Sequence, residues 1–189
     1  MIPSVVSVSK SGKEGLDLLS YEFTKNRKIH LFSEINDTVA MEIISQLEYL
    51  DSTGNDDIKF YINSLGGSVS AGFAIVDAMN RCKCDVSVIC TGMAASMGAF
   101  ILSSGAKGKR YATPLSEIMI HQPLGGAQGQ ASDIQLAADH ISKIKDKLHG
   151  ILAQNTSQSV ETISRDCDRD YWMNAEEALK YGLVDKILV

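Results

Sequence analysis

The sequence has no apolar run near the ~18 residues that a membrane-spanning helix needs. Its first residues also lack the basic-then-apolar layout of a secretory signal peptide. We therefore expect no membrane association and a cytoplasmic location. An excess of basic residues is missing as well. The formal net charge is −5, so the chain offers no electrostatic footprint for nucleic acid.

Cysteine is scarce, and the spacings typical of metal sites are absent. Cys82 and Cys84 have no matching histidine pair, and neither they nor Cys90 and Cys167 form a CxxC pair. We expect buried, reduced thiols and no metal. The glycines within Gln122–Gln130 match neither the P-loop nor the G-x-G-x-x-G fingerprint, so we expect no nucleotide site there.

The overall composition is typical of a soluble globular domain. The chain has 189 residues, of which 44% are hydrophobic and 22% are charged. A chain of this length can bury about 70% of its unfolded surface without disulfides or metals. Strand-like segments alternate with helical patterns from Lys28 onward, and we therefore predict an α/β fold in a single domain, residues 1–189.

Two consecutive segments, Ile58–Arg81 and Val86–Gly105, repeat one strand-turn-helix plan. In the first, a strand over Ile58–Ile62 leads into a Gly-rich turn and a helix. In the second, a strand over Val86–Cys90 leads into small residues and a helix that we expect to begin near Ala94. Both turns can direct backbone N–H groups into the same space.

The second turn contains a serine, Ser96. A sharp strand-to-helix turn exposes a side chain above the packed layer, and the first N–H groups of a helix lack intrahelical partners. The stretch Ala94–Gly98 also resembles the G-x-S-x-G elbow of serine hydrolases, with alanine in place of the first glycine. Ser96 is therefore a candidate nucleophile. The alternative is an ordinary N-cap serine.

Four histidines could provide a general base. His30 lies inside a predicted strand, Lys28–Phe32, and His140 and His149 lie beside the apolar seam of a long helix. His121 differs from these three. It ends an apolar strand and precedes a Gln-Pro-Leu-Gly-Gly segment, along whose flexible backbone a peptide could lie.

A third group, which would orient the imidazole, is offered by three carboxylates near the C-terminus: Asp166, Asp168 and Asp170. Asp170 directly precedes an aromatic strand, whereas the other two could be surface residues or ion-pair partners of Arg169. Spacing alone does not choose among the three.

The longest helical pattern begins near Ser132, which has the capping-box spacing to Gln135. At ~1.5 Å per residue, its roughly 22 residues extend about 33 Å, which exceeds the thickness of a small domain. We expect part of this helix to project and pack against another subunit. The alternative is that it lies across its own core. Its apolar seam consists of Ile134, Ala137, Ile141, Ile144, Leu148 and Ile151.

Several motifs together resemble the ClpP family, the proteolytic subunits of the Clp protease. They are Gly92–Phe100, Met119–Gln130 and Asp168–Asp170, and the resemblance covers essentially the whole chain. It implies a fold of the ClpP and crotonase type, a spiral of β-β-α units with a projecting handle. The handle corresponds to about residues 122–154, and residues 1–17 correspond to an N-terminal axial arm.

The resemblance assigns a catalytic role to each candidate residue. It implies that Ser96 is the nucleophile, His121 the general base and Asp170 the residue that orients the base. It also implies an oxyanion hole formed by the backbone N–H groups of Gly67 and Met97, so that both small-residue turns contribute to one site.

The resemblance further implies a homo-oligomer of two stacked heptameric rings, a tetradecamer, with Asp168 and Arg169 at the ring interface. The serines then face a closed chamber that only unfolded polypeptides enter, where they are degraded to short peptides. A Clp-family AAA+ ATPase feeds these chains and uses the ATP, so the proteolytic subunit itself needs no cofactor. This activity is ATP-dependent proteolysis in protein quality control.

Some positions depart from the family pattern. Leu65 replaces the proline of the family's Asn-Ser-Pro-Gly-Gly turn, which puts the rigidity of that turn in doubt. Lys59 and Arg81 stand where the ATPase-docking cleft usually has aromatics, and Tyr61 is the remaining aromatic candidate. Two alternatives therefore stay open. One is a weakly active or structural subunit that works mainly with a ClpP paralogue, and the other is an acyl-CoA enzyme of the crotonase kind.

Overall fold

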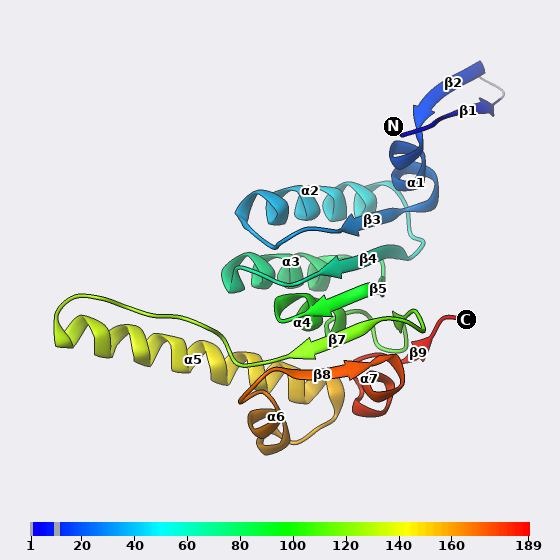
Figure 1. Ribbon diagram of the computed structural model, residues 1–189. Helices are drawn as coiled ribbons and strands as arrows, with labels where there is room; N and C mark the ends of the chain where they lie inside the picture. Colours follow the sequence, from blue (N-terminus) through cyan, green and yellow to red (C-terminus); the bar gives the residue numbers. More distant parts are fainter. Residues whose placement is uncertain (1, 10–11) are drawn as a thin grey trace.

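Helices and strands alternate along the chain in the computed structural model, which describes residues 2–9 and 12–189 (Figure 1). The prediction of an α/β fold is confirmed. None of the helices within these ranges is both long and apolar enough to cross a bilayer. The strands are β1 (Ser4–Ser9), β2 (Gly12–Asp17), β3 (Lys28–Leu31), β4 (Ile58–Ser64), β5 (Val86–Ala95), β6 (Arg110–Ala112), β7 (Glu117–Ile120), β8 (Tyr171–Asn174) and β9 (Lys186–Ile187). The helices are α1 (Leu18–Asn26), α2 (Asp37–Thr53), α3 (Val69–Arg81), α4 (Met97–Ser103), α5 (Ala131–Thr156), α6 (Val160–Asp166) and α7 (Ala175–Tyr181).

The main sheet is largely parallel, in the order β3-β4-β5-β6-β9. Strand β7 pairs with the end of β5 and is antiparallel to β8. Helices α2, α3 and α4 are stacked beside the sheet in the same order as β3, β4 and β5 (Figure 1). Because parallel strands end at the same edge of a sheet, the segments that follow β3, β4 and β5 meet there, where α/β proteins usually bind ligands.

Strand β4 shows how the apolar pattern builds this core. Ile58, Phe60 and Ile62 are fully buried, whereas Lys59 is exposed and Tyr61 is half-buried. Successive side chains of a strand point to opposite faces of the sheet. Phe60 therefore packs into the core, and Lys59 and Tyr61 share the other face.

Helix α2 is capped at its N-terminus and buries one face. The Asn36 side chain caps it by accepting a hydrogen bond from the Val39 amide at 3.0 Å. Ser159 caps α6 in the same way, and Asn174 and Glu177 form a capping box at the start of α7. The buried face of α2 recurs at helical spacing: Ala40, Ile43, Leu47 and Leu50.

Strand β5 is longer than predicted, and α4 begins later. The strand continues to Ala95 because Met93–Ala95 pair with Glu117–Met119 of β7. These tertiary hydrogen bonds override the helix propensity of the alanines. The helix therefore begins at Met97, and its predicted start at Ala94 is wrong.

The two ends of the chain differ in how well the sequence predicted them. Val5, Val6 and Val8 among polar residues and glycine favour a loose arm or hairpin at the N-terminus, and β1 and β2 form an antiparallel hairpin apart from the main sheet (Figure 1). The apolar residues of Leu183–Val189 favour a strand over that whole range, and the observed strand is shorter. Only Lys186–Ile187 pair with β6, and Leu183 and Val184 are buried in the turn after α7.

Helix α5 projects well beyond the sheet (Figure 1). Leu148, Leu152 and Ala153 in its C-terminal half are buried. In its N-terminal half, Ile134 is 45% exposed and Leu136 is 68% exposed. The alternative that the whole helix lies across its own core is therefore wrong, and apolar side chains of the projecting half face solvent in the single chain.

Two details of α5 correct the sequence prediction. The capping box between Ser132 and Gln135 does not form, because the N-cap is Gln130, two residues before Ser132, and the Gln135 side-chain amide instead donates to Asp139 at 2.8 Å. His149 was placed beside the apolar seam, but it is buried. Burial lowers the pKa of its imidazole, and the charge of Lys145 lowers it further.

Candidate active site

Ser96 lies in the turn between β5 and α4, as predicted. Its backbone angles are φ 55° and ψ −120°, a conformation that non-glycine residues rarely adopt and that tends to be retained at functional sites. It occupies the N-cap position of α4, but its side chain makes no capping hydrogen bond. The N-cap interpretation is therefore wrong for its hydroxyl group.

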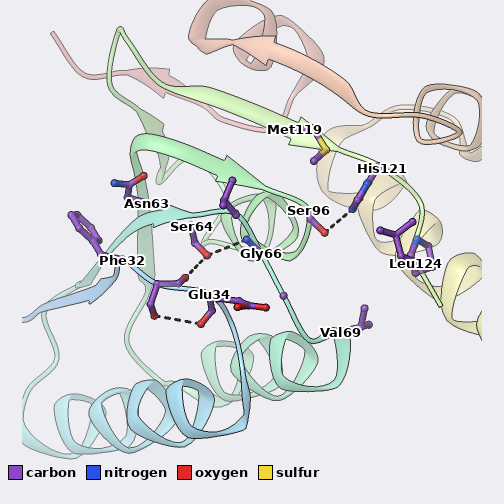
Figure 2. A pocket seen from close by; sticks show the side chains of 14 residues that line it. Phe32, Glu34, Asn63, Ser64, Gly66, Val69, Ser96, Met119, His121 and Leu124 are labelled. Carbon is purple, nitrogen blue, oxygen red and sulfur yellow. Dashed lines mark hydrogen bonds between the residues drawn. The ribbon is translucent and has the colours of Figure 1, made fainter. Parts of the chain in front are cut away.

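The Ser96 hydroxyl instead contacts His121. Its Oγ lies 2.8 Å from Nε2 of the imidazole (Figure 2), and Nδ1 lies 3.0 Å from Oδ1 of Asp170. The pairing of β7 with β8 explains this arrangement, because Ile120 lies opposite Tyr171 in the antiparallel ladder. His121 follows Ile120 and Asp170 precedes Tyr171, so in an antiparallel pair these two residues face each other.

The other two carboxylates have different partners. Asp166 accepts a hydrogen bond from the Tyr181 hydroxyl at 3.0 Å and pairs with Arg165 at 2.9 Å. The carboxylate of Asp168 lies 4.0 Å from Arg169, and both of these side chains are exposed. The choice that spacing left open is thus decided by geometry in favour of Asp170.

Two glycines bring the end of β4 against the Ser96 turn. Gly66 and Gly67 have φ values of 96° and 145°. A Cβ atom on Gly66 would lie 2.8 Å from the Ser96 Cβ and 2.9 Å from the Met97 nitrogen, so a side chain does not fit there. Within the residues that the structure describes, the N–H groups of Gly67 and Met97 donate to no protein acceptor. Both are available to a negatively charged oxygen.

Ser64, which the sequence analysis did not single out, fastens the glycine turn. Its Oγ donates to the Ser33 carbonyl at 2.6 Å and accepts from the Gly66 amide at 3.1 Å (Figure 2). The Ile35 amide also donates to the Gly66 carbonyl at 2.8 Å. The turn is therefore held from both sides even though Leu65 replaces the family's proline. A serine directly before a turn with paired glycines was the signal that could have identified Ser64.

The Ser96 hydroxyl borders a cleft of about 640 Å³ at the carboxyl edge of the sheet. The cleft lies between the segments that follow β3, β4 and β7, and its walls are largely apolar. Its volume is within the range of ligand-binding pockets. The lining residues are Phe32, Ser33, Glu34, Asn63, Ser64, Leu65, Gly66, Gly67, Val69, Ser96, Met119, His121, Pro123 and Leu124 (Figure 2).

Comparison with protein-family models matches residues 11–189 to the model described as Clp protease. The chain belongs to the Clp protease family. The match covers nearly the whole chain, so the resemblance inferred from the sequence motifs is confirmed. Membership of the Clp protease family marks the chain as a serine-type protease, a hydrolase of peptide bonds, and the α/β architecture agrees with the Clp protease fold.

The candidate docking residues that the sequence resemblance named, Lys59, Tyr61 and Arg81, lie on β4 and at the end of α3. Lys59 is exposed, and the Tyr61 ring stacks on His30 with 5.4 Å between ring centroids. His30 also lines a cavity of about 330 Å³ beside α1. Arg81 lies 3.5 Å from Glu48 in an exposed ion pair. A role for these residues in docking stays a prediction.

The cysteines lie away from the Ser96 cleft. Cys84, Cys90 and Cys167 are buried, Cys82 is half-buried, and none is in a disulfide. Burial raises the pKa of the Cys90 thiol to about 11 and that of Cys167 to about 12, so both stay protonated at neutral pH. No group of three His, Cys, Asp or Glu side chains in the described ranges is arranged to hold a metal ion.

Proposed function

We propose that the protein is a serine endopeptidase whose nucleophile is Ser96. The observation that carries this proposal is the 2.8 Å contact between Ser96 Oγ and His121 Nε2. An imidazole at this distance accepts the hydroxyl proton while the oxygen attacks a peptide carbonyl, and then donates it to the leaving amine. In the second half of the reaction His121 takes a proton from water, which attacks the acyl carbonyl, and then returns that proton to Ser96 Oγ as the bond between Oγ and the acyl carbon breaks.

The remaining groups of the site have supporting roles in this proposal. Asp170 accepts a hydrogen bond from the protonated Nδ1 of His121, so that Nε2 is unprotonated and able to accept the proton of Ser96. The N–H groups of Gly67 and Met97 bind the oxyanion of the tetrahedral intermediate. In other proteases, removal of one such donor lowers kcat by about 10²- to 10³-fold.

We propose further that the protein acts as a homo-oligomer of two stacked heptameric rings. The projecting half of α5 supports this, because Ile134 and Leu136 are apolar and exposed in the single chain. Asp168 and Arg169 are also exposed and would lie at the ring interface. A Clp-family AAA+ ATPase would deliver unfolded polypeptides into the chamber and consume the ATP. The peptide cleavage itself would need no cofactor.

A second candidate is a subunit of low activity that functions mainly in mixed rings with a ClpP paralogue. The exposed cationic side chains of Lys59 and Arg81 favour it, because they would weaken apolar docking of the ATPase. An acyl-CoA enzyme of the crotonase kind has less support. Such an enzyme needs no serine nucleophile, whereas Ser96 is already hydrogen-bonded to His121.

The test is covalent labelling by a fluorophosphonate together with hydrolysis of fluorogenic peptides. We expect labelling at Ser96, and loss of at least about 10³-fold in kcat for Ser96→Ala with assembly unchanged. Ser45→Ala on α2, whose hydroxyl donates to the Met41 carbonyl of the same helix, serves as the control and should retain activity. Unchanged hydrolysis by Ser96→Ala would refute the peptidase proposal. Hydrolysis that appears only after mixing with a paralogue would favour the second candidate.

A further inference from the structure

The Ser96 cleft contains one carboxylate, that of Glu34. Apart from His121, Glu34 is the only ionisable side chain among the described residues that line the cleft. It also takes part in none of the ion pairs within the part of the chain that the structure describes. An exposed carboxylate is negatively charged at neutral pH, so the cleft presents one uncompensated negative charge to a bound peptide.

The backbone holds Glu34 in this place. Ile35 is buried and bridges to Gly67, and its amide donates to the Gly66 carbonyl at 2.8 Å. A Cβ atom on Gly67 would lie only 2.2 Å from the Ile35 carbonyl oxygen, which shows how closely the two segments run. Neighbouring side chains of an extended segment point in opposite directions. Burial of Ile35 therefore leaves Glu34 on the open side, among the side chains gathered around Ser96 (Figure 2).

Exposed apolar side chains line the same cleft as this carboxylate. Phe32 is 57% exposed, Leu65 is 71% exposed and Leu124 is 84% exposed, and all three line the same cleft. An apolar wall with a single negative charge fits a side chain that has a long aliphatic stem and a cationic head. Lysine and arginine have both, because their stems pack on apolar surface while the charged group reaches a polar partner.

We propose that Glu34 selects peptide substrates that carry lysine or arginine close to the scissile bond. This inference rests on the proposed peptidase function. The charge also bears on the chemistry, because a carboxylate next to the glycine turn opposes the negative charge that develops on the oxyanion. A bound lysine or arginine side chain neutralises it, so the preference is expected in kcat/KM and not only in binding.

The experiment compares peptides that differ at one position at a time, from two residues before to two residues after the scissile bond. Each position carries lysine, norleucine or glutamate, where norleucine keeps most of the stem without the charge. At one position we expect lysine to be preferred over norleucine by about 2- to 5-fold in kcat/KM, the range of partly exposed ion pairs.

Glu34→Gln should reduce this lysine-to-norleucine ratio to about 1, and raising the salt to about 1 M should weaken the preference. Glu34→Lys should shift the preference to glutamate. Glu42→Gln, an equal charge change on the exposed face of α2, should keep the lysine preference.

A binding measurement separates this inference from the peptidase proposal. Fluorescence anisotropy of the same labelled peptides with Ser96→Ala, and with Ser96→Ala combined with Glu34→Gln, reports recognition without turnover. A lysine preference in binding that depends on Glu34 would support the inference even if no peptide were hydrolysed, and only the peptidase proposal would then fail. Three results would overturn the inference. They are no lysine preference at any position, a lysine preference that Glu34→Gln leaves unchanged, and a Glu34→Gln variant that changes kcat/KM equally for the lysine, norleucine and glutamate peptides.

Discussion

The amide of Ser96 donates a hydrogen bond to the carbonyl oxygen of Met119 at 2.8 Å. This bond continues the pairing of β5 with β7, in which Ala95 lies opposite Met119. His121 follows Met119 by two residues, so one ladder of backbone hydrogen bonds sets the positions of both the serine turn and the histidine. The Ser96–His121 contact is therefore built into the sheet and does not depend on a mobile loop.

The first prediction concerns Asp170. Asp170→Asn should lower kcat for fluorogenic peptides by about 10²- to 10⁴-fold, because an asparagine cannot hold the His121 tautomer that accepts the serine proton. Asp56→Asn, which removes an exposed carboxylate charge in the loop before β4, is the matched control and should have a small effect on peptide cleavage. Equal losses in both variants would show that the loss does not come from the contact with the imidazole.

The second prediction concerns Ser64. Ser64→Ala removes both hydrogen bonds that fasten the glycine turn, so the Gly67 amide should lose alignment and kcat should fall about 10-fold, with KM little changed. The control is Ser103→Ala, since Ser103 is a buried serine that also donates to one carbonyl and accepts from one amide but lies in α4. Its catalytic rate should stay near that of the unmodified protein. If both variants lose kcat equally, the loss reflects general destabilisation.

The third prediction concerns the pair formed by Arg110 and Asp185, which joins β6 to the loop before β9. Arg110 Nε lies 2.9 Å from Asp185 Oδ2, and both side chains are largely buried. Removal of one partner from a buried pair leaves the other charge uncompensated, so Asp185→Asn should lower the free energy of unfolding by about 3 kcal/mol. Urea unfolding at neutral pH measures this difference. Asp133→Asn, at an exposed site on α5, is the control.

The same pair predicts a dependence on pH. Burial raises the pKa of the Asp185 carboxyl, but the hydrogen bonds and charge of Arg110 outweigh it, so the folded pKa lies below the ordinary value of 3.8. A carboxyl with a lowered pKa stabilises the fold above its unfolded pKa, and this contribution is lost as the pH falls through the folded pKa. The difference in unfolding free energy between the unmodified protein and Asp185→Asn should therefore be constant at neutral pH and shrink below about pH 4. A difference that persists there would contradict the assignment.

The fourth prediction concerns docking of the partner ATPase. Lys59 and Tyr61 share one face of β4, next to the cavity that His30 lines, and desolvation of an unpaired cation beside an apolar ligand is costly. The homo-oligomer should therefore bind its ATPase weakly. The double change Lys59→Tyr, Arg81→Phe should tighten binding about 10-fold or more in biolayer measurements, equivalent to about 1.4 kcal/mol. Lys107→Tyr, in the exposed loop before β6, should leave binding unchanged. Equal affinity of the unmodified chain and the double variant would refute this interpretation.

The local features of the fold could be read from the sequence because each depends on residues close together in the chain. The alternation of Ile58, Phe60 and Ile62 with polar neighbours defined β4, and Asn36 and Asn174 marked the starts of α2 and α7. Small residues on both sides of Ser96 likewise predicted a tight turn before a helix. Propensity, periodicity and capping are short-range effects, so these predictions did not require a partner segment.

Contacts between distant segments were decided only by the tertiary structure. Spacing could not choose among three aspartates, and the β7–β8 register placed Asp170 opposite His121 across 49 positions of sequence. Pairing with β7 extended β5 beyond Cys90, and Ser64 and Glu34 reached the site through bonds between the ends of β3 and β4. The motifs and family resemblance named the chemistry of this protein because they record residue types. Its geometry depends on strand register and backbone pairing, which form only when segments far apart in the chain come together.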